Sequence, residues 1–251
     1  MSCVDIRGCR IGEGRPKVIL PIVERAEAAI LEKAAQFSTL QADCVEWRVD
    51  YFEGARAPGA VARCLAKMRV ILRDKLLLVT FRTKAESGEQ ALSHPEYLAF
   101  LRLILDTDCA DLLDIEFFTA GADLPNLVEQ AHSAGVAVVC SSHDFTKTPP
   151  RAELVCRMVQ MQQAGADLPK VAVMPQSRTD VLELLAATAE MADLHPETPV
   201  ITMSMGVLGA VSRLAGETFG SAMTFANPGQ ASAPGQVSLD IVNEVLDTLH
   251  S

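Results

Sequence analysis

The stretch GADLPKVAVMPQS, residues 165–177, contains a short apolar run rich in β-branched residues, bounded by Pro169 and Pro175. A run of this length between residues that interrupt regular structure predicts a buried β-strand. Lys170 is the charged residue of this run. An ammonium group rarely enters a protein interior unless it is paired or neutral, because removing an unpaired charge from water is costly. The lysine therefore marks a position where burying a charge needs an explanation.

Further runs of the same character occur along the chain, and the eight predicted strands are 17–23, 44–50, 76–82, 111–118, 136–145, 169–175, 199–205 and 221–226. Amphipathic stretches typical of helices separate most of them, at 25–37, 59–74, 95–107, 124–135, 151–165, 179–194 and 209–220. Strands that alternate with helices predict parallel βαβ units. Eight such units in 251 residues favour a (β/α)8 TIM barrel over an open doubly wound sheet. Because no linker or low-complexity tract interrupts the series, we expect residues 1–251 to form one α/β catalytic domain.

The overall composition argues against several classes of protein. A formal net charge of −10 and the lack of a lysine- or arginine-rich run argue against a nucleic-acid partner. The seven cysteines are scattered without C-x-x-C spacing, which indicates reduced thiols rather than a disulfide framework or a zinc site. No segment has the apolar length of a signal peptide core or a membrane span. We therefore expect a soluble, cytoplasmic protein without a membrane partner.

The predicted strands carry polar side chains on one face. In the second strand every other residue is charged, namely Glu46, Arg48 and Asp50, and the residues between them are apolar. Because the apolar face of a barrel strand packs on helices, the charged face is expected to point into the barrel. Polar residues of the other strands have matching parity, and these are Thr80, Arg82, Asp114, Glu116, His143 and Lys170. Charges of both signs should therefore converge on the barrel axis.

Each of these residues also has a structural explanation. A single polar residue at a strand end is often hydrated or hydrogen-bonded locally, and Asp114 and Glu116 would in that case anchor loops or pair with Lys170. So many charges inside one barrel reduce stability, however, and such clusters are typical of active sites. The cluster as a whole therefore favours an active site.

Lys170 indicates the chemistry of that site. Its expected neighbours on its own strand are Ala172 and Met174, so burial should favour a neutral amine that attacks a carbonyl carbon. The resulting imine withdraws electrons, which lets a general base remove a proton from the adjacent carbon. His143, in SSHDFTKTP (141–149) at the end of the preceding strand, is the candidate base, although an isolated histidine is more often structural.

No nucleotide- or metal-binding pattern accompanies these residues. The glycines of GVLGAVSRLAG (206–216) have neither the spacing of a dinucleotide loop nor a Walker A lysine. The five histidines do not cluster as metal ligands, so we expect neither metal nor cofactor. Arg213, with Ser232 and Gln236 in the loop after the last strand, is positioned to hold an anionic group of a substrate. The alternative for this segment is a surface salt bridge and an ordinary turn.

Six segments carry these residues in a recognisable order: EWRVDYFEG (46–54), VTFRTKAESGEQ (79–90), SSHDFTKTP (141–149), PKVAVMPQS (169–177), ITMSMGVLGAVSRLAGETFGSAMTFA (201–226) and ASAPGQ (231–236). Together they resemble the type I 3-dehydroquinate dehydratases, and the resemblance extends from about residue 17 to the C-terminus. It implies a homodimeric (β/α)8 barrel without cofactor or metal. It also implies dehydration of 3-dehydroquinate to 3-dehydroshikimate, in the shikimate pathway of aromatic amino acid biosynthesis or in quinate breakdown.

The resemblance also implies roles for individual residues. Lys170 matches the lysine that forms the imine, His143 the general acid and base, and Glu86 the carboxylate that positions the histidine. The family's contacts to the ring hydroxyls are matched by Glu46, Arg48 and Arg82, and its contacts to the substrate carboxylate by Arg213, Ser232 and Gln236. Its apolar wall is matched by Met203, Met205 and Phe225. Glu24 and Arg25, after the first strand, depart from the family pattern and have no assigned role.

Two other functions share some of these features. A class I aldolase also uses a barrel and an imine-forming lysine, but it often binds phosphate, and the chain lacks a glycine-rich phosphate site. A non-catalytic metabolite sensor of the same fold would be expected to have lost Lys170 or His143 and to carry a further domain. Since the chain has both residues, the dehydratase is favoured.

Overall fold

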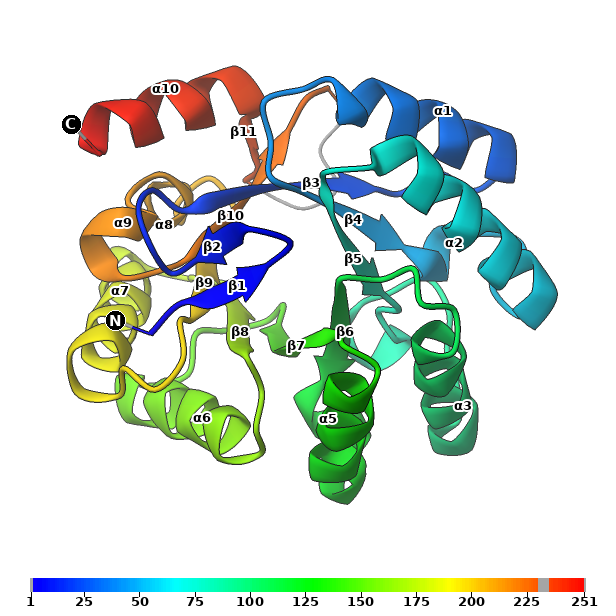
Figure 1. Ribbon diagram of the computed structural model, residues 1–251. Coiled ribbons are helices and arrows are strands. Elements are labelled where there is room, and N and C mark those ends of the chain that lie inside the picture. Colours follow the sequence, from blue (N-terminus) through cyan, green and yellow to red (C-terminus); the bar gives the residue numbers. More distant parts are fainter. Residues whose placement is uncertain (1, 230–234, 251) are drawn as a thin grey trace.

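The computed structural model describes residues 2–229 and 235–250, and a ring of parallel strands lies at its centre (Figure 1). The strands of the ring are β3 (Lys17–Ile22), β4 (Cys44–Arg48), β5 (Leu76–Thr80), β6 (Leu112–Glu116), β7 (Ala137–Asp144), β8 (Leu168–Val173), β9 (Ile201–Ser204) and β10 (Met223–Asn227). From β3 to β9 each strand pairs with the next, and β10 pairs with β3. A parallel bridge between Val200 and Ser221 joins the segments that precede β9 and β10. The ring is therefore closed, which confirms the predicted (β/α)8 barrel.

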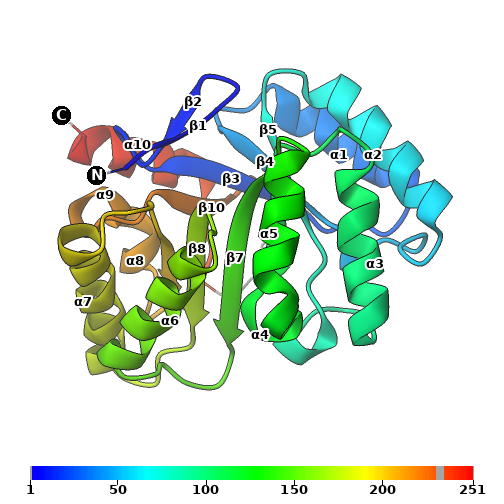
Figure 2. The same cartoon turned by 60° about the horizontal axis from the view of Figure 1, so that its bottom comes forward.

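Helices surround the barrel on the outside (Figures 1 and 2). The long ones are α1 (Glu27–Ser38), α2 (Pro58–Leu72), α3 (His94–Leu105), α5 (Leu124–Ser133), α6 (Arg151–Gln163), α7 (Arg178–Leu194) and α10 (Leu239–Leu249). The short elements are α4 (Phe117–Ala120), α8 (Val211–Leu214), α9 (Gly216–Phe219) and the 3-10 turns η1 (Val49–Tyr51), η2 (Lys84–Glu86) and η3 (Gly121–Asp123). Among the described residues, no helix combines the length and the apolar content that crossing a membrane requires.

The C-terminal part differs from the predicted elements. The stretch 209–220 forms two short helices instead of one, and Gly220, with φ of 97°, ends the second. Helix α10 is additional to the predicted elements, although Leu239, Val242 and Leu246 have the spacing of one buried helix face. A two-residue strand, β11 (Val237–Ser238), precedes it and pairs in parallel with β10.

A hairpin that the sequence did not predict covers the N-terminal end of the barrel (Figure 1). Its strands, β1 (Val4–Ile6) and β2 (Cys9–Ile11), pair antiparallel. Strands of three residues are too short for an alternating pattern to be recognised in sequence. Ile11 is fully buried and packs on the apolar residues inside the barrel, so the hairpin closes this end of the interior.

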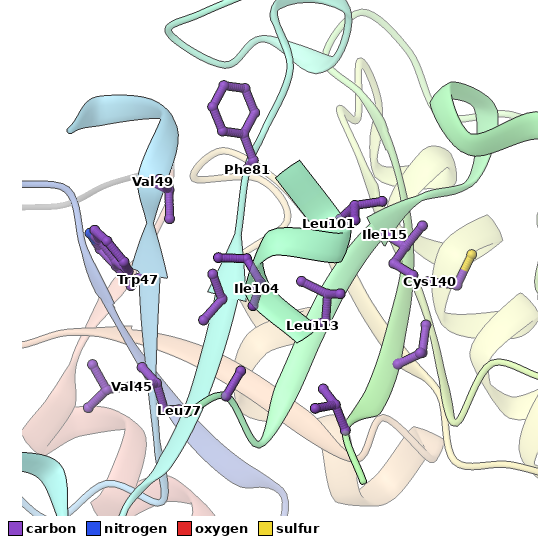
Figure 3. Packing of buried hydrophobic residues seen from close by; sticks show 14 of the residues in the cluster. Val45, Trp47, Val49, Leu77, Phe81, Leu101, Ile104, Leu113, Ile115 and Cys140 are labelled. Carbon is purple, nitrogen blue, oxygen red and sulfur yellow. The ribbon is translucent and has the colours of Figure 1, made fainter. Parts of the chain in front are cut away.

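Apolar side chains form two layers. The larger layer lies between the barrel and the helices, and Figure 3 shows part of it, including Val45 and Trp47 of β4, Leu113 of β6 and Ile104 of α3. The smaller layer fills the barrel interior toward the N-terminal ends of the strands and includes Ile19, Cys44, Leu76, Leu78, Leu112, Val139, Leu168, Ile201 and Met223. The two layers take opposite faces of each strand, as the alternation predicts.

Polar side chains follow the inner apolar layer toward the C-terminal ends of the strands. The buried ones are Glu46, Thr80, Asp114, Glu116, Ser141 and Lys170. The register places Ser141 of β7 between Glu116 of β6 and Lys170 of β8. The strands are shorter than predicted, so Asp50 and Arg82 lie just beyond β4 and β5. The predicted convergence of charges inside the barrel is therefore confirmed, at the end where the strands finish.

Candidate active site

A pocket opens at the C-terminal ends of the strands, lined by Glu46, Arg48, Tyr51, Arg82, Ser87, His143, Phe145, Lys170, Ala172, Met203, Met205, Arg213, Phe225 and Gln236. It brings together the predicted site residues that the structure describes, except Glu86, which contacts His143 from outside the lining. Ser232 lies outside the described residues. A second cavity, between the N-terminal hairpin and α7, has Glu217 as the one charged residue of its described lining. The lysine and histidine predicted to carry the chemistry therefore lie together in the first pocket.

The amine of Lys170 lies against two carboxylates. Its Nζ donates to Oδ2 of Asp114 over 3.2 Å and lies 4.0 Å from Oε1 of Glu46. The ring of Phe225 is centred 4.8 Å from the same nitrogen. The closed barrel therefore brings carboxylates of β4 and β6 to this lysine, in addition to its apolar neighbours on β8, and the pairing with Asp114 that the sequence left open is formed. The amine is thus enclosed by two carboxylates and an aromatic ring, with 3% of the side chain exposed.

Asp114 connects this lysine to Arg82. Its Oδ1 accepts from Nη2 of Arg82 over 2.9 Å and from the hydroxyl of Ser141 over 2.7 Å. Burial would raise the pKa of Asp114, but the charges of Arg82 and Lys170 outweigh burial and hold that pKa below its ordinary value. Asp114 is therefore ionised at neutral pH and serves both cations.

Arg82 is enclosed by acceptors. Besides its contact with Asp114, its Nη1 lies 3.0 Å from Oε1 of Glu116, 3.0 Å from Oγ of Ser141 and 3.3 Å from Oε2 of Glu86. Burial opposes its charge, but the three carboxylates outweigh burial, and the pKa of Arg82 is raised. Arg82 therefore acts first as the shared counter-ion of three carboxylates, at the edge of the pocket.

His143 and Glu86 form a hydrogen-bonded pair, with 2.7 Å between Nδ1 of the histidine and Oε2 of the glutamate. Burial, assisted by the positive charges of Arg82 and Lys170, holds the pKa of His143 well below its ordinary value. Burial also raises the pKa of Glu86 to about 8, against the opposing effect of Arg82. The pair therefore changes its proton content near neutral pH, where general acid–base catalysis is most effective.

The loop 82–90 holds Glu86 at this position. Glu116 fixes the start of the loop, because its two oxygens accept from the backbone amide and the hydroxyl of Thr83 over 2.8 and 2.7 Å. Near the end of the loop, a Cβ added at Gly88 would lie 1.9 Å from the carbonyl oxygen at the start. The chain therefore closes on itself here, and only glycine fits at this position.

Arg48 approaches the pocket from the end of β4. Its Nε and Nη2 donate to the two oxygens of Asp50, each over 2.8 Å. The ring of Tyr51 is centred 5.0 Å from its guanidinium carbon. The carboxylate and the ring hold the guanidinium from two directions, so its orientation toward the pocket is set before a ligand binds.

Arg213 reaches the pocket from α8. It is 2% exposed, and its Nη1 lies 3.7 Å from the sulfur of Met203. Burial lowers the pKa of Arg213 to about 10, which still leaves the guanidinium charged at neutral pH. Met205 and Phe225 add to the apolar wall around it. A charged guanidinium in such surroundings suits an anionic group of a ligand.

Four residues of the described lining lie outside the predicted set of site residues: Tyr51, Ser87, Phe145 and Ala172. Each follows a predicted site residue by one to three positions along the chain. The ring of Phe145 stacks near that of His143, with 6.2 Å between centroids and 19° between planes. The sequence search weighed charge and missed the aromatic rings that flank the charged groups. These lining residues could have been identified in the sequence from their position next to a charged strand end.

Two further sequence features lie away from the pocket. Arg25 pairs with Glu89 over 2.7 Å, and Glu24 lies 3.8 Å from Lys33, so both residues form surface ion pairs. No group of three or more histidine, cysteine, aspartate or glutamate side chains within the described part of the chain is arranged to hold a metal ion.

Comparisons with known proteins agree with this geometry. The family model described as Type I 3-dehydroquinase matches residues 18–251. A 3-dehydroquinate dehydratase of Bacillus licheniformis is 46% identical over 247 residues, covering 98% of this chain and 97% of the relative. The structure of a type I 3-dehydroquinate dehydratase from Clostridium difficile with covalent modified comenic acid has a TM-score of 0.96 and 43% identity, covering 99% of this chain and 98% of that one. A 3-dehydroquinate dehydratase structure from Enterococcus faecalis has a TM-score of 0.93 and 41% identity, covering 99% and 100%. The chain therefore belongs to the type I 3-dehydroquinase family.

Proposed function

We propose that this chain dehydrates 3-dehydroquinate to 3-dehydroshikimate through an imine on Lys170, with His143 as general acid and base. Family membership supports the overall reaction, that of a carbon–oxygen lyase in the shikimate pathway, and favours it over an aldolase. The observation that carries the mechanism is a buried lysine amine in the same pocket as a histidine–carboxylate pair. The covalent modified comenic acid in the Clostridium difficile relative supports covalent chemistry in this family.

In the proposed reaction, Nζ of Lys170 loses a proton and attacks the ketone carbon C3 of the substrate. Loss of water leaves a protonated imine, whose positive charge acidifies the hydrogens on C2. Nδ1 of His143 faces Glu86, so Nε2 is the nitrogen that takes the C2 proton. The C1 hydroxyl then leaves and takes a proton from His143 to become water. Hydrolysis of the imine uses the first water again, so the net change is the loss of one water.

We assign the other predicted residues to substrate binding. The substrate carboxylate is held by Arg213, Ser232 and Gln236. The ring hydroxyls are contacted by Glu46, Arg48 and Arg82. The apolar wall is formed by Met203, Met205 and Phe225. The support for this assignment is that Arg213 and these three apolar residues come from β9, β10 and the segment between them, whereas the charged residues Glu46, Arg48 and Arg82 come from β4 and the end of β5. An anionic group and a set of hydroxyls therefore find matching surroundings on different sides.

We further infer that residues 1–251 act as one domain in a cytoplasmic homodimer, without metal or cofactor. Exposed apolar side chains at Val207, Leu208 and Val211 support a contact between copies. Light scattering on the purified protein should give twice the mass of one chain. A mass equal to one chain at micromolar concentration would argue against the dimer.

Trapping with borohydride tests the imine. Borohydride added with 3-dehydroquinate should inactivate the protein and attach one reduced ligand to the peptide that contains Lys170. Lys170→Ala should abolish labelling and the absorbance of the conjugated enone product, with circular dichroism showing that the variant is folded. Exposed Lys147, in the same sample, should stay unlabelled, because an accessible amine is mostly protonated at neutral pH. Activity that survives borohydride, or a label on another lysine, contradicts the mechanism.

A further inference from the structure

We propose that Asp50 is a positioning residue that holds two parts of the active site in one arrangement, the guanidinium of Arg48 and the loop 82–90 that carries Glu86. The inference rests on the proposed function for the identity of the substrate. Asp50 itself is fully buried and is not among the described residues that line the pocket. It therefore acts through other groups rather than on the substrate.

The first contact of Asp50 is with Arg48. The two guanidinium nitrogens Nε and Nη2 each donate to one carboxylate oxygen over 2.8 Å, which is the two-point geometry that fixes the plane of an arginine. The ring of Tyr51 lies over the same guanidinium. Within the described part of the chain, Nε and Nη2 are the nitrogens of Arg48 that donate to Asp50, which leaves Nη1 for the pocket that Arg48 lines. Asp50 thus decides which edge of Arg48 a substrate hydroxyl meets.

The second contact is with the loop 82–90. Oδ1 of Asp50 accepts from the backbone amide of Arg82 over 3.3 Å, and Oδ2 accepts from the backbone amide of Glu89 over 3.1 Å. The backbone carbonyl of Asp50 also accepts from Nε2 of Gln90 over 2.8 Å. These groups lie at the start and the end of the loop, with Glu86 between them. Asp50 therefore fixes both ends of the segment that places Glu86 against His143.

The two contacts share oxygen atoms, so an amide cannot replace the carboxylate. Each oxygen of Asp50 accepts from one nitrogen of Arg48 and from one amide of the loop. Asparagine has one accepting oxygen, and its NH2 group would face two donors in either orientation. Asp50→Asn must therefore disturb Arg48 and the loop together.

Asp111 offers a matched control at the other end of the barrel. It is nearly as buried, and its Oδ2 accepts from Nη1 of Arg69 over 2.6 Å and from the amide of Leu77 over 2.8 Å. It precedes β6, at the N-terminal end of the strands and far along the barrel from the pocket. Both bonds fall on one oxygen, so Asp111→Asn can keep them on its amide oxygen and removes chiefly the negative charge beside Arg69. It therefore reports what the charge of a merely structural carboxylate contributes.

The kinetic test compares the two variants with the unaltered protein. For Asp50→Asn, kcat/KM for 3-dehydroquinate should fall on the order of a hundredfold, the usual effect of displacing a catalytic group by about 1 Å. The pH dependence of kcat should shift as well, because Glu86 no longer meets His143 in the same geometry. Asp111→Asn should lower the unfolding temperature while leaving kcat, KM and the pH profile unchanged. Equal effects of the two variants on activity would overturn the proposal.

A titration of His143 without substrate tests this inference separately from the proposed function. With 13C-labelled histidine and no substrate, the titration midpoint of His143 should differ between the unaltered protein and Asp50→Asn, and it should not differ for Asp111→Asn. A His143→Gln sample assigns the resonance. If the unaltered protein fails to dehydrate 3-dehydroquinate, the proposed function is wrong, and the titration still decides the role of Asp50. An unchanged midpoint would refute the loop contact.

A double-variant cycle tests the contact with Arg48. In an Arg48→Gln background, Asp50→Asn should no longer change KM, because the guanidinium that it orients is absent, yet it should still shift the pH profile. If Asp50→Asn raises KM by the same factor in both backgrounds, Asp50 does not act through Arg48.

Discussion

The proposed nucleophile lies against two carboxylates. Attack on a ketone needs the neutral amine, so in the proposed mechanism Lys170 loses a proton while Asp114 and Glu46 lie beside it. In the proposed mechanism His143 takes this proton, because its low pKa keeps the imidazole neutral at working pH. After the imine has formed in this mechanism, the carboxylate of Asp114 faces the positive charge of the protonated imine. The proposed mechanism therefore places the same two carboxylates beside the amine in the first step and beside a cation in the steps that follow.

Glu86→Gln should change the pH dependence of kcat. Nε2 of His143 accepts a proton only when Glu86 is ionised and takes the Nδ1 hydrogen, so kcat should rise with pH through about 8. Glutamine does not titrate, so the variant should lose this rise and have a lower plateau, by about 10²-fold. Initial rates between pH 5 and 9 measure both effects. A rise at the same pH in the variant would assign it to another group.

The same substitution should act on stability with a defined sign. The pKa of Glu86 is raised in the folded state, from 4.5 to about 8, so its contribution to stability is present below 4.5 and is lost as pH rises through about 8. The free energy of unfolding of Glu86→Gln, which lacks this loss, should exceed that of the unaltered protein at pH 8.5. At pH 5 the difference should be smaller or reversed. Urea titrations at the two pH values measure it.

The loop 82–90 depends on one glycine. Alanine at position 88 would put a methyl group 1.9 Å from a carbonyl oxygen of the same loop, so the loop must open and move Glu86. Gly88→Ala should therefore lower kcat on the order of a hundredfold and destabilise the fold by about 1–3 kcal/mol. Gly59→Ala, on α2 beside the flexible end of Arg63, should keep full activity. An active Gly88→Ala protein would show that the loop does not position Glu86.

Elements were predictable where their pattern is long. Each of the eight barrel strands overlaps an apolar run of the sequence, because a strand covered by helices on one side needs several consecutive buried residues. The ends were less predictable: the charged residues Asp50 and Arg82 continue the alternation beyond the last strand pairing. The β1–β2 hairpin has too few residues to show a period. Whether a strand could be predicted therefore depended on the length of its apolar pattern and not on its importance to the fold.

The apolar layer that stabilises the barrel and the charged residues of the pocket lie at opposite ends of the barrel axis. Apolar side chains and the hairpin fill the N-terminal end, whereas charged side chains gather at the C-terminal end. In a (β/α)8 barrel this division is general, because the loops that follow the strands vary without disturbing the packing at the other end. Damage to one end should therefore leave the other end intact.

Ile11→Ala tests this division. Ile11 is fully buried in the inner apolar layer, so its truncation should cost about 2–5 kcal/mol of unfolding free energy, while kcat of the folded protein stays unchanged. Ile241→Ala, on α10 with 49% of the residue exposed, should change stability by less than about 0.5 kcal/mol. Denaturant titration and initial rates give the two quantities. A fall in kcat for Ile11→Ala would mean that the two ends are coupled.

The sequence alone determined which residues face inward. The alternation of Glu46 and Arg48 with apolar neighbours, and the position of Lys170 in a buried run, depend only on the two-residue period of a strand. That local property was enough to predict the polar interior and the lysine within it, whereas the barrel itself was predicted from the eight alternating strands and helices. The family resemblance supplied the expected partner of His143, which the strand period does not indicate.

The tertiary structure decided which inward residues meet. Glu86 and His143 are 57 positions apart, and Asp114 and Lys170 are 56 apart, so their contacts depend on strand order, register and closure of the ring. The same is true of Asp50, whose carboxylate joins β4 to the loop after β5. Whether a buried amine lies among apolar groups or against carboxylates is set by the strands across the barrel, and a period along one strand carries no information about them.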